Sequence, residues 1–336
     1  MICIHRVDLL ATSQVNKMTV TVQQMKVEDL QDVKRVDMIA WGELIKRDYP
    51  DVVKFTSRTD QNILSFLHSD AKGAFVACDD RAGVIGSSFC HVWGKTGWVG
   101  PISVLPSYQG RGVGKELLKS SLRYLEDRAC FNIGLETMPE NQVNLGMYLK
   151  VGMRPEGFVL VMGRKLDEVE PPEESFGEVT VDRYSESDVK GHLLAQVKRI
   201  SNALSPGLDY SSEVVLTQEY SFGDTLVASH RGKVSGFCVL HTVPRREQME
   251  VASIRILATD PAVQDDMVGP LVTAAEIMAV DARSLEISLP VPAQCRRPLD
   301  IAFSRDYQLV QAYARLMWMG GSSVTEKTNN LCTWSG

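Results

Sequence analysis

The stretch Val104-Leu-Pro-Ser-Tyr-Gln-Gly-Arg-Gly-Val-Gly-Lys-Glu-Leu-Leu118 joins the end of an expected strand to a glycine-rich turn and the start of an amphipathic helix. Its three glycines let the backbone bend sharply and bring several N–H donors close to an anion. The dipole of the following helix adds attraction at the same point. Because Arg111 and Lys115 supply positive charge, the stretch predicts a binding site for a polyphosphate.

Two common phosphate-binding motifs do not fit this loop. The Gly-x-x-x-x-Gly-Lys-Ser/Thr motif would need glycine at 109 and Ser or Thr at 116, where the chain has Gln109 and Glu116. The dinucleotide fingerprint Gly-x-Gly-x-x-Gly fits Gly110 and Gly112 and then meets Lys115 where its third glycine belongs. A nucleoside-triphosphate enzyme and a dinucleotide enzyme are therefore both disfavoured.

The loop resembles instead a motif of the GNAT acetyltransferase superfamily. Gln109-Gly-Arg-Gly-Val-Gly114 is similar to its Gln/Arg-x-x-Gly-x-Gly/Ala motif, whose backbone amides hold the pyrophosphate of acetyl-CoA, and Ile102-Ser-Val104 followed by Pro106 resembles the fourth strand entering it. The resemblance implies acetyl-CoA as acyl donor and no metal. The residues that it implies for acetyl-CoA binding are Ile102, Ser103, Val104, Gln109, Gly110, Arg111, Gly112, Val113, Gly114, Lys115 and Asn141.

A second stretch carries the same resemblance, one helix and one strand downstream. Leu135-Glu-Thr-Met-Pro-Glu-Asn141, with Met147-Tyr148 and Gly152-Met153, resembles the family's Leu-Glu-Val-x-x-x-Asn-x-x-Ala-x-x-Leu-Tyr-x-x-x-Gly-Phe. The departures are Asn144 for alanine, Met147 for leucine and Met153 for phenylalanine.

The resemblance also implies catalytic roles. Tyr148 matches the tyrosine that protonates or hydrogen-bonds the CoA sulfur, and a phenol with a pKa of about 10 can donate to a thiolate. Glu136 matches a glutamate that is the general base in some members and in others only orients water or pairs on the sheet. Strands four and five of the fold splay beside the loop, so the acetyl carbonyl can meet a backbone N–H within 102–104. No carboxylate occurs in 97–104, so water or Glu136 must take the proton.

Periodicity predicts an α+β domain over residues 18–168. Strands are expected at 19–25, 74–78, 84–92, 97–104, 133–137 and 158–165, and helices at 27–41, 60–68, from 113 onward and at 142–151. This is the element order implied by the GNAT resemblance, with a mixed, mostly antiparallel sheet flanked by helices. Asn141 matches a residue that contacts the CoA arm, and it would equally serve as a helix cap.

The same order restarts after an acidic segment with two prolines. Strands are expected at 179–182, 224–230, 234–242 and 250–257, and a helix at 187–204. The corresponding loop, 258–269, lacks a glycine cluster and contains Asp260, Asp265 and Asp266, which would repel a pyrophosphate. The chain is therefore expected to be a tandem GNAT protein. It would consist of an extension at 1–17, an intact domain at 18–168, a linker at 169–175 and a degenerate GNAT-like domain at 176–336 that shapes the acceptor site.

Composition limits the function classes. The 336 residues exceed one ordinary core, and 44% hydrophobic with 23% charged residues is typical of a globular protein. A net charge of −6 argues against nucleic-acid binding. The largest basic clusters, Arg245-Arg246 and Arg296-Arg297, are expected to be solvated surface. No apolar stretch approaches the ~20 residues of a membrane span.

The seven cysteines and six histidines indicate no metal site. No Cys-x-x-Cys occurs, so neither a zinc site nor a disulfide framework is expected, and a reducing cytoplasm is the simple inference. His91 and His241 lie in strand-like runs and are expected to be ordinary sheet residues.

The expected function is transfer of an acetyl group from acetyl-CoA to a primary amine, by direct attack in a ternary complex. The acceptor would be a small molecule or a peptide amine. The three aspartates of 258–269 would suit a cationic amine, although solvated surface explains them equally well. An acyl-cysteine route is disfavoured because Cys78 and Cys90 lie in the expected hairpin, away from the loop. The alternative is an acetyl-CoA-binding sensor or interaction module without turnover.

Overall fold

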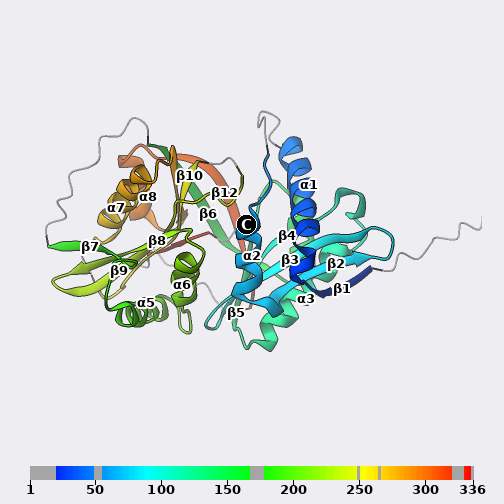
Figure 1. Cartoon of the computed structure of the whole chain (residues 1–336), viewed down its shortest axis with the longest axis horizontal. Coiled ribbons are helices and arrows are strands. Elements are labelled where there is room, and N and C mark those ends of the chain that lie inside the picture. Colours follow the sequence, from blue (N-terminus) through cyan, green and yellow to red (C-terminus); the bar gives the residue numbers. More distant parts are fainter. Residues whose placement is uncertain are drawn as a thin grey trace, which may run out of the picture.

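Two lobes lie side by side, and one sheet of thirteen described strands runs through both (Figure 1). The coordinates are a computed structural model. They describe residues 20–48, 55–166, 178–247, 250–263, 266–319 and 329–333. The predicted extension 1–17 and the predicted linker 169–175 lie outside the described residues, as do Cys3 and Asp265.

The first lobe follows the predicted element order. Its strands are β1 (Val20–Gln24), β2 (Ala74–Asp79), β3 (Gly83–Trp93), β4 (Thr96–Val104), β5 (Asn132–Thr137) and β6 (Arg154–Lys165). Its helices are α1 (Leu30–Asp48), α2 (Asp60–Ser69), α3 (Val113–Asp127) and α4 (Gln142–Val151), with 3-10 turns at Val27–Asp29, Ala71–Gly73 and Pro106–Tyr108. Two elements are longer than predicted, since α1 continues past Trp41 and β6 begins before Phe158.

Helix α3 is held by the apolar face that its sequence predicts. Val113 and Leu117 join the core under the outer strands, and Leu118, Leu122 and Leu125 join the core beside β5. This face lies against β3 and β4. The packing fixes the start of α3 at the end of β4, where the glycine loop lies.

The second lobe repeats the element order of the first. Its elements are β7 (Val179–Arg183), α5 (Lys190–Leu204), α6 (Ser211–Glu219), β8 (Gly223–His230), β9 (Lys233–His241), β10 (Val251–Thr259), α7 (Val268–Asp281), β11 (Glu286–Pro292), α8 (Arg296–Ser304), β12 (Gln308–Met319) and β13 (Asn330–Cys332). In both lobes a strand and two helices precede three antiparallel strands, a helix, a strand, a helix and a long last strand. The fold is therefore two GNAT-like domains, and the sequence patterns gave no range for α6 or for the elements after β10.

The two lobes share their last strands. The order in the sheet is β1-β2-β3-β4-β5-β12-β6-β11-β10-β9-β8-β7. β12 pairs antiparallel with β5 and with β6, and β6 also pairs antiparallel with β11. The long strand β12 of the chain's second half therefore completes the sheet of the first half, and Figure 1 shows β6 and β12 crossing the boundary between the lobes.

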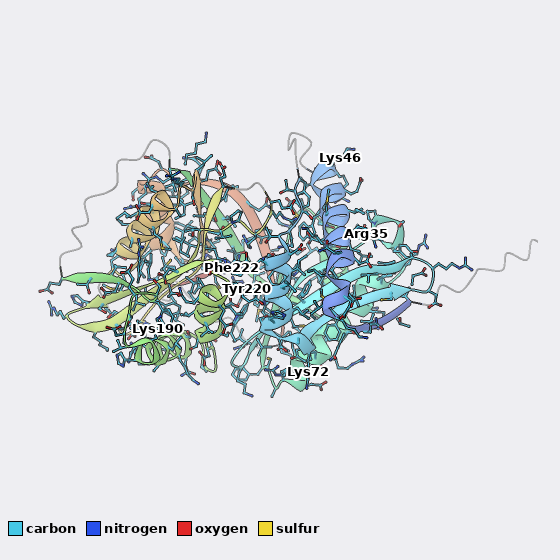
Figure 2. All side chains as sticks on the ribbon, viewed as in Figure 1. Arg35, Lys46, Lys72, Lys190, Tyr220 and Phe222 are labelled. Atoms are coloured by element: carbon cyan, nitrogen blue, oxygen red, sulfur yellow. The ribbon has the colours of Figure 1, made fainter. Side chains whose placement is uncertain are left out.

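Helices and loops add contacts across the same boundary. The Gln61 Nε2 donates to the backbone oxygen of Tyr220 over 2.6 Å, and the His68 ring contacts the Tyr220 hydroxyl. Tyr220 stacks on Phe222, and Figure 2 shows both rings where the lobes meet beside α2. The Lys95 N–H donates to a carbonyl of the other lobe over 2.7 Å. These contacts fix the lobes against each other around the sites described below.

Candidate active site

Strands β4 and β5 separate halfway along their length. Their parallel ladder joins Thr96–Trp98 to Asn132–Gly134, and no later pairs are formed between these described strands. On the other side of β4, the register with β3 shifts between the pairs Ser88–Ile102 and Cys90–Val99. Residues 102–104 stay paired with β3 on one side, while the side of β4 that faces β5 has no described strand partner beyond Trp98 and borders a gap, as the resemblance implied.

A pocket of about 520 Å³ occupies this gap. It brings together four residues that the sequence proposed for the site, namely Ile102, Glu136, Asn141 and Tyr148. The other residues that line it are Trp41, Leu44, Val99, Gly100, Pro101, Thr137, Met138, Asn144 and Tyr313. Tyr313 lies on β12, so the second half of the chain contributes to the wall.

Tyr148 lies on α4 and is buried against this wall. Burial raises the pKa of its phenol to about 12, and a side-chain hydrogen bond with Thr137 partly offsets that rise. The phenol therefore stays protonated at neutral pH and can act as a hydrogen-bond donor.

Glu136 is fully engaged by protein partners. Its side chain is 0% exposed, and its Oε1 accepts from the Arg315 Nη2 over 2.8 Å and from the Nε over 3.2 Å. Its Oε2 accepts from the Thr333 hydroxyl over 2.7 Å. This geometry matches the alternative in which the glutamate pairs on the sheet, because the carboxylate ties β5 to β12 and to the chain near β13.

Asn141 combines a capping position with a place in the pocket. Its side chain accepts a hydrogen bond of 3.1 Å from the Asn144 N–H at the start of α4. It is 8% exposed and lines the gap between the strands. Asn141 therefore caps α4 and also lies where it could contact a ligand in the pocket.

The glycine loop has the backbone that the sequence predicted. Gly110 has φ +73° and Gly112 has φ +88°, a left-handed conformation that favours glycine, and Gly112 caps α3. A Cβ at either position would meet nothing within 4 Å, so there is open space above the loop. The Gln109 amide donates to the Val104 carbonyl over 3.0 Å and joins the loop to β4. Lys115 is exposed at the first turn of α3.

Beside the loop, Val113 is buried under the start of α3, and Gly114 lies in the first turn of that helix with room for a Cβ. A Cβ on Gly114 would lie 3.7 Å from the Val104 side chain and 3.8 Å from the Met147 sulfur. Arg111 lies over the ring of Tyr108 at 5.5 Å.

Ser103 connects β4 to a buried ionic network. Its hydroxyl accepts from the Trp41 Nε1 over 3.1 Å and donates to Asp37 over 3.5 Å. Asp37 also accepts from the Arg58 Nε over 3.0 Å and pairs with Arg246 at 3.1 Å. Ser103 is therefore a link to charged groups behind the strand.

The prediction that Arg245-Arg246 is solvated surface is wrong. The Arg246 side chain is only 11% exposed, and an Arg245 guanidinium nitrogen is buried. The residues that bury them come from α1, α2 and the loop after β9. Because these segments are far apart in the sequence, the Arg-Arg pair alone could not indicate that it is buried. Arg296 and Arg297 are 91% and 69% exposed, as expected.

The aspartates of the second loop have protein partners. Asp260 is 2% exposed and pairs with Arg199 at 2.6 Å, so the interpretation as solvated surface fails for this residue. Asp266 accepts from the Val268 N–H over 3.0 Å and pairs with Arg297 at 3.1 Å. Neither carboxylate is left with an uncompensated charge for a cationic acceptor.

The described residues contain no disulfide and no cluster of three metal-binding side chains. Burial raises the pKa values of the Cys78 and Cys90 thiols, so neither is poised to act as a thiolate nucleophile at neutral pH. None of the helices in the described ranges has the length and apolar character of a membrane span.

Comparison with known proteins identifies the family of the first lobe. Residues 38–153 match the profile of the Acetyltransferase (GNAT) family. This part of the chain belongs to the GNAT superfamily. Glucosamine 6-phosphate N-acetyltransferase of Candida albicans is 28% identical over 120 residues, which are 36% of this chain and 77% of that protein. The match supports acetyl transfer, in general terms, as the activity of this domain.

Solved structures extend the likeness to both lobes. A Pyrococcus horikoshii protein classed as an acetyltransferase has a TM-score of 0.67 at 15% identity and covers 98% of this chain and 99% of its own. A tandem GNAT protein from the clavulanic acid biosynthesis pathway has a TM-score of 0.58 at 10% identity and covers 90% of this chain and 100% of its own. These likenesses show that the fold is a tandem GNAT fold.

Proposed function

We propose that this GNAT protein is an N-acetyltransferase that moves an acetyl group from acetyl-CoA to a primary amine in a ternary complex. One observation carries the proposal. The gap between β4 and β5 holds a buried, protonated Tyr148 beside unpaired β4 backbone, and the glycine loop follows at the end of β4. Stability alone would favour continued hydrogen bonding between β4 and β5, because paired backbone groups are more stable than unpaired ones.

The donor would bind along the loop and the gap. Backbone N–H groups of residues 110–115 would hold the pyrophosphate, because the first turn of a helix has N–H groups without helical partners. Arg111 and Lys115 would neutralise phosphate charge from the exposed side. Asn141 would contact the arm of CoA from the wall of the pocket.

The chemistry needs an oxyanion donor, an acid and a proton acceptor. As the amine nitrogen bonds to the acetyl carbon, a β4 backbone N–H within 102–104 would stabilise the carbonyl oxygen. The carbon–sulfur bond then breaks, and Tyr148 would donate a proton or a hydrogen bond to the thiolate. The ammonium proton would pass to water, because both oxygens of Glu136 already accept hydrogen bonds. We therefore assign Glu136 to positioning the wall of the pocket.

The second half, residues 176–336, would shape the acceptor side, while residues 18–168 bind the donor. Tyr313 already lines the pocket from β12. Asp260 lies in the loop that corresponds to the phosphate loop, and it pairs with Arg199, so that arginine is already engaged by the protein. The predicted division at 169–175 and a cytoplasmic location remain parts of this proposal.

The name of the Candida albicans relative supports a small-molecule amine as acceptor. The test is release of CoA, followed with a thiol reagent, from acetyl-CoA and a panel of amino sugars, polyamines, amino acids, aminoglycosides and peptide amino termini. Release that requires one class of amine supports the proposal. Tight acetyl-CoA binding with no release across the panel would support the alternative, a sensor without turnover.

A further inference from the structure

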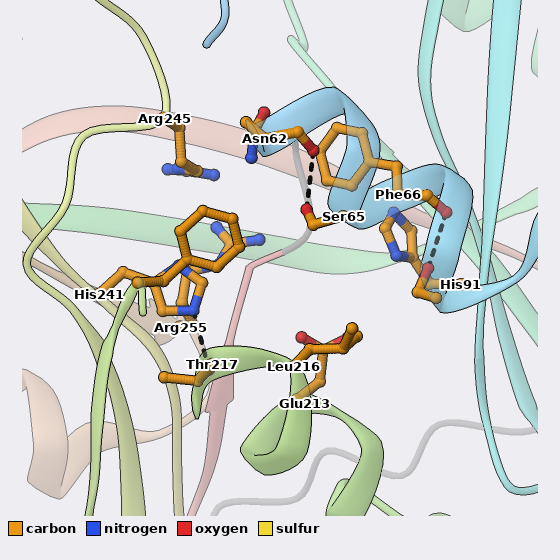
Figure 3. Close-up of a pocket in the computed structure, with 12 residues that line it drawn as sticks. Asn62, Ser65, Phe66, His91, Glu213, Leu216, Thr217, His241, Arg245 and Arg255 are labelled. Atoms are coloured by element: carbon orange, nitrogen blue, oxygen red, sulfur yellow. Dashed lines mark hydrogen bonds between the residues drawn. The ribbon is translucent and has the colours of Figure 1, made fainter. Parts of the chain in front are cut away.

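A second pocket, of about 420 Å³, lies between the lobes. Figure 3 shows Asn62 and Phe66 of α2 on one side, and Arg245, Arg255 and His241 of the second lobe on the other. The α6 helix closes the pocket with Glu213, whose carboxylate accepts from the Trp93 Nε1 over 2.8 Å.

An adjoining cavity of about 500 Å³ shares two of these residues, His241 and Arg245. It adds further basic side chains to the wall, so that four guanidinium groups from both lobes surround the two spaces. We call this group the arginine cluster, and its members are Arg58, Arg245, Arg246 and Arg255.

Protein groups leave two donors of the cluster without hydrogen bonds. Arg58 is 1% exposed, and it donates from Nε to Asp37 and from Nη1 to Asn62 over 3.0 Å each. Its Nη2 is buried and has no hydrogen-bond partner in the described structure, and the same holds for the Nη1 of Arg245. A buried charged donor without a partner destabilises the fold, because the group has lost its water without gaining an acceptor. A bound acceptor would remove that destabilisation.

The charges of the site do not balance. Asp37 pairs with Arg58 and Arg246, and the charges of Glu213 and Glu136 act on Arg255, so the carboxylates near the cluster are fewer than its guanidiniums. Burial lowers the pKa of Arg245 and of Arg246, the latter to about 10, and repulsion from Arg58 adds to both shifts. The neighbouring His91 and His241 rings have pKa values lowered by burial and add no charge at neutral pH.

We propose that the arginine cluster binds the anionic group of the acceptor, so that the acceptor is a small amine carrying a phosphate monoester. This inference rests on the acetyltransferase function proposed above. Guanidinium groups recognise phosphate and carboxylate with paired hydrogen bonds. A phosphate monoester carries up to two negative charges and three acceptor oxygens, so it can accept from several guanidiniums at once, whereas a carboxylate has one charge and two oxygens.

The cluster lies next to the acetyl-transfer pocket. Trp41 lines that pocket and donates to Ser103 on β4, and Ser103 donates to Asp37. Asp37 in turn holds Arg58 and Arg246. An acceptor anchored at the cluster would therefore have its amine on the side of the open β4 edge.

The test of the anion site is calorimetric titration of the full chain with inorganic phosphate. We expect saturable binding that Arg245→Gln weakens at least about tenfold, while Arg245→Lys, which keeps the charge, retains part of it. Arg296→Gln, at an exposed position, is the matched control and should bind as the unmodified protein does. Phosphate should also raise the unfolding temperature of the unmodified protein, which is informative even if Arg245→Gln folds poorly. No saturable binding, or equal binding by Arg245→Gln in its folded form, would overturn the inference.

Kinetics separate this inference from the acetyltransferase proposal. Ethanolamine, O-phosphoethanolamine and β-alanine are compact amines that differ in their anionic group. We expect kcat/KM to be at least about tenfold higher for the phosphorylated amine and Arg245→Gln to abolish that preference, whereas Arg296→Gln, at an exposed position outside the cluster, should keep both the preference and the turnover of ethanolamine. Turnover without a phosphate preference would overturn the anion site alone. Phosphate binding without any acetyl transfer would support the anion site and count against the acetyltransferase proposal.

Discussion

Position 112 of the acetyl-CoA loop has two requirements. Its residue must adopt a left-handed backbone conformation, and it must carry no negative charge. The φ of Gly112, +88°, disfavours a side chain, while the space beside it is open. Gly112→Asp should therefore fold with a modest loss of stability and bind acetyl-CoA at least about tenfold more weakly, because its carboxylate would meet the pyrophosphate. Gly112→Asn has the same shape without the charge and tolerates this backbone. Calorimetry that gives equal affinities for the two variants would rule out the charge effect.

Tyr148→Phe tests the proposed acid. Loss of the hydroxyl should lower kcat by about 10²-fold or more while acetyl-CoA affinity changes little. Because burial raises the pKa of this phenol to about 12, the donor stays protonated through neutral and mildly alkaline pH, so its own titration should not reduce the rate there. Tyr124→Phe is the control, since that hydroxyl bonds Asp70. Unchanged steady-state and single-turnover rates in Tyr148→Phe would remove this residue from the mechanism.

The buried His91 should make the free energy of unfolding depend on pH. Burial lowers its pKa from 6.5 to about 4, and its Nε2 lies 3.0 Å from the Gly100 oxygen. The unfolded chain takes up the proton first as pH falls, so the stabilisation is complete above pH 6.5 and is lost toward pH 4. Between pH 7 and 5 this residue should lower the free energy of unfolding by about 2 kcal/mol. His91→Gln should reduce this slope in urea unfolding, whereas His192→Gln, at an exposed position, should retain it.

Local sequence patterns were sufficient to predict the elements of the first lobe. The glycines of 110–114, the helical repeat after Val113 and the alternating strands all act over a few residues, and the structure has them where they were expected. The partners of Glu136 and Arg245 could not be predicted in this way, because Arg315 and Asp37 are far away in the sequence. An isolated charge pattern does not reveal whether a distant partner will bury it.

A buried ion pair between Glu136 and Arg315 joins β5 to β12. Arg315→Met would leave the Glu136 carboxylate buried without its charged partner, and should lower the free energy of unfolding by about 3–5 kcal/mol. The double variant Glu136→Gln with Arg315→Met removes both charges and should be more stable than Arg315→Met alone. Urea unfolding of the three proteins measures the difference. A double variant less stable than Arg315→Met would contradict the pairing.

Because β12 pairs with β5 and β6, and β6 pairs with β11, we expect the two lobes to fold as one unit. The sequence predicted two repeats, because element order is visible along the chain, yet it did not predict that β12 lies between β5 and β6. Strand neighbours that are distant in sequence follow from packing of the whole molecule, and hairpin neighbours are the easier prediction. The acceptor-side residues that lie on β12, including Tyr313, were missed for the same reason.

Separating the lobes tests this arrangement. Residues 18–168 alone would leave one edge of β5 and both edges of β6 without their partners, because β6 pairs only with β11 and β12 among the described strands. We expect this fragment to aggregate or lack cooperative unfolding, and to bind acetyl-CoA only when it is produced together with residues 176–336. Circular dichroism, size-exclusion chromatography and calorimetry would follow this. A fragment 18–168 that unfolds cooperatively and binds acetyl-CoA like the full chain would show that β12 is dispensable.

The central claim is that the gap between β4 and β5 transfers acetyl groups to an amine. The measurement that tests it most directly is amine-dependent release of CoA from acetyl-CoA, compared between the unmodified chain, Tyr148→Phe and Gly112→Asp. The account predicts release that requires the amine, is lost with acetyl-CoA binding in Gly112→Asp, and falls in Tyr148→Phe while binding persists. Equal release by all three proteins, or acetyl-CoA binding with no release for any amine, would contradict it.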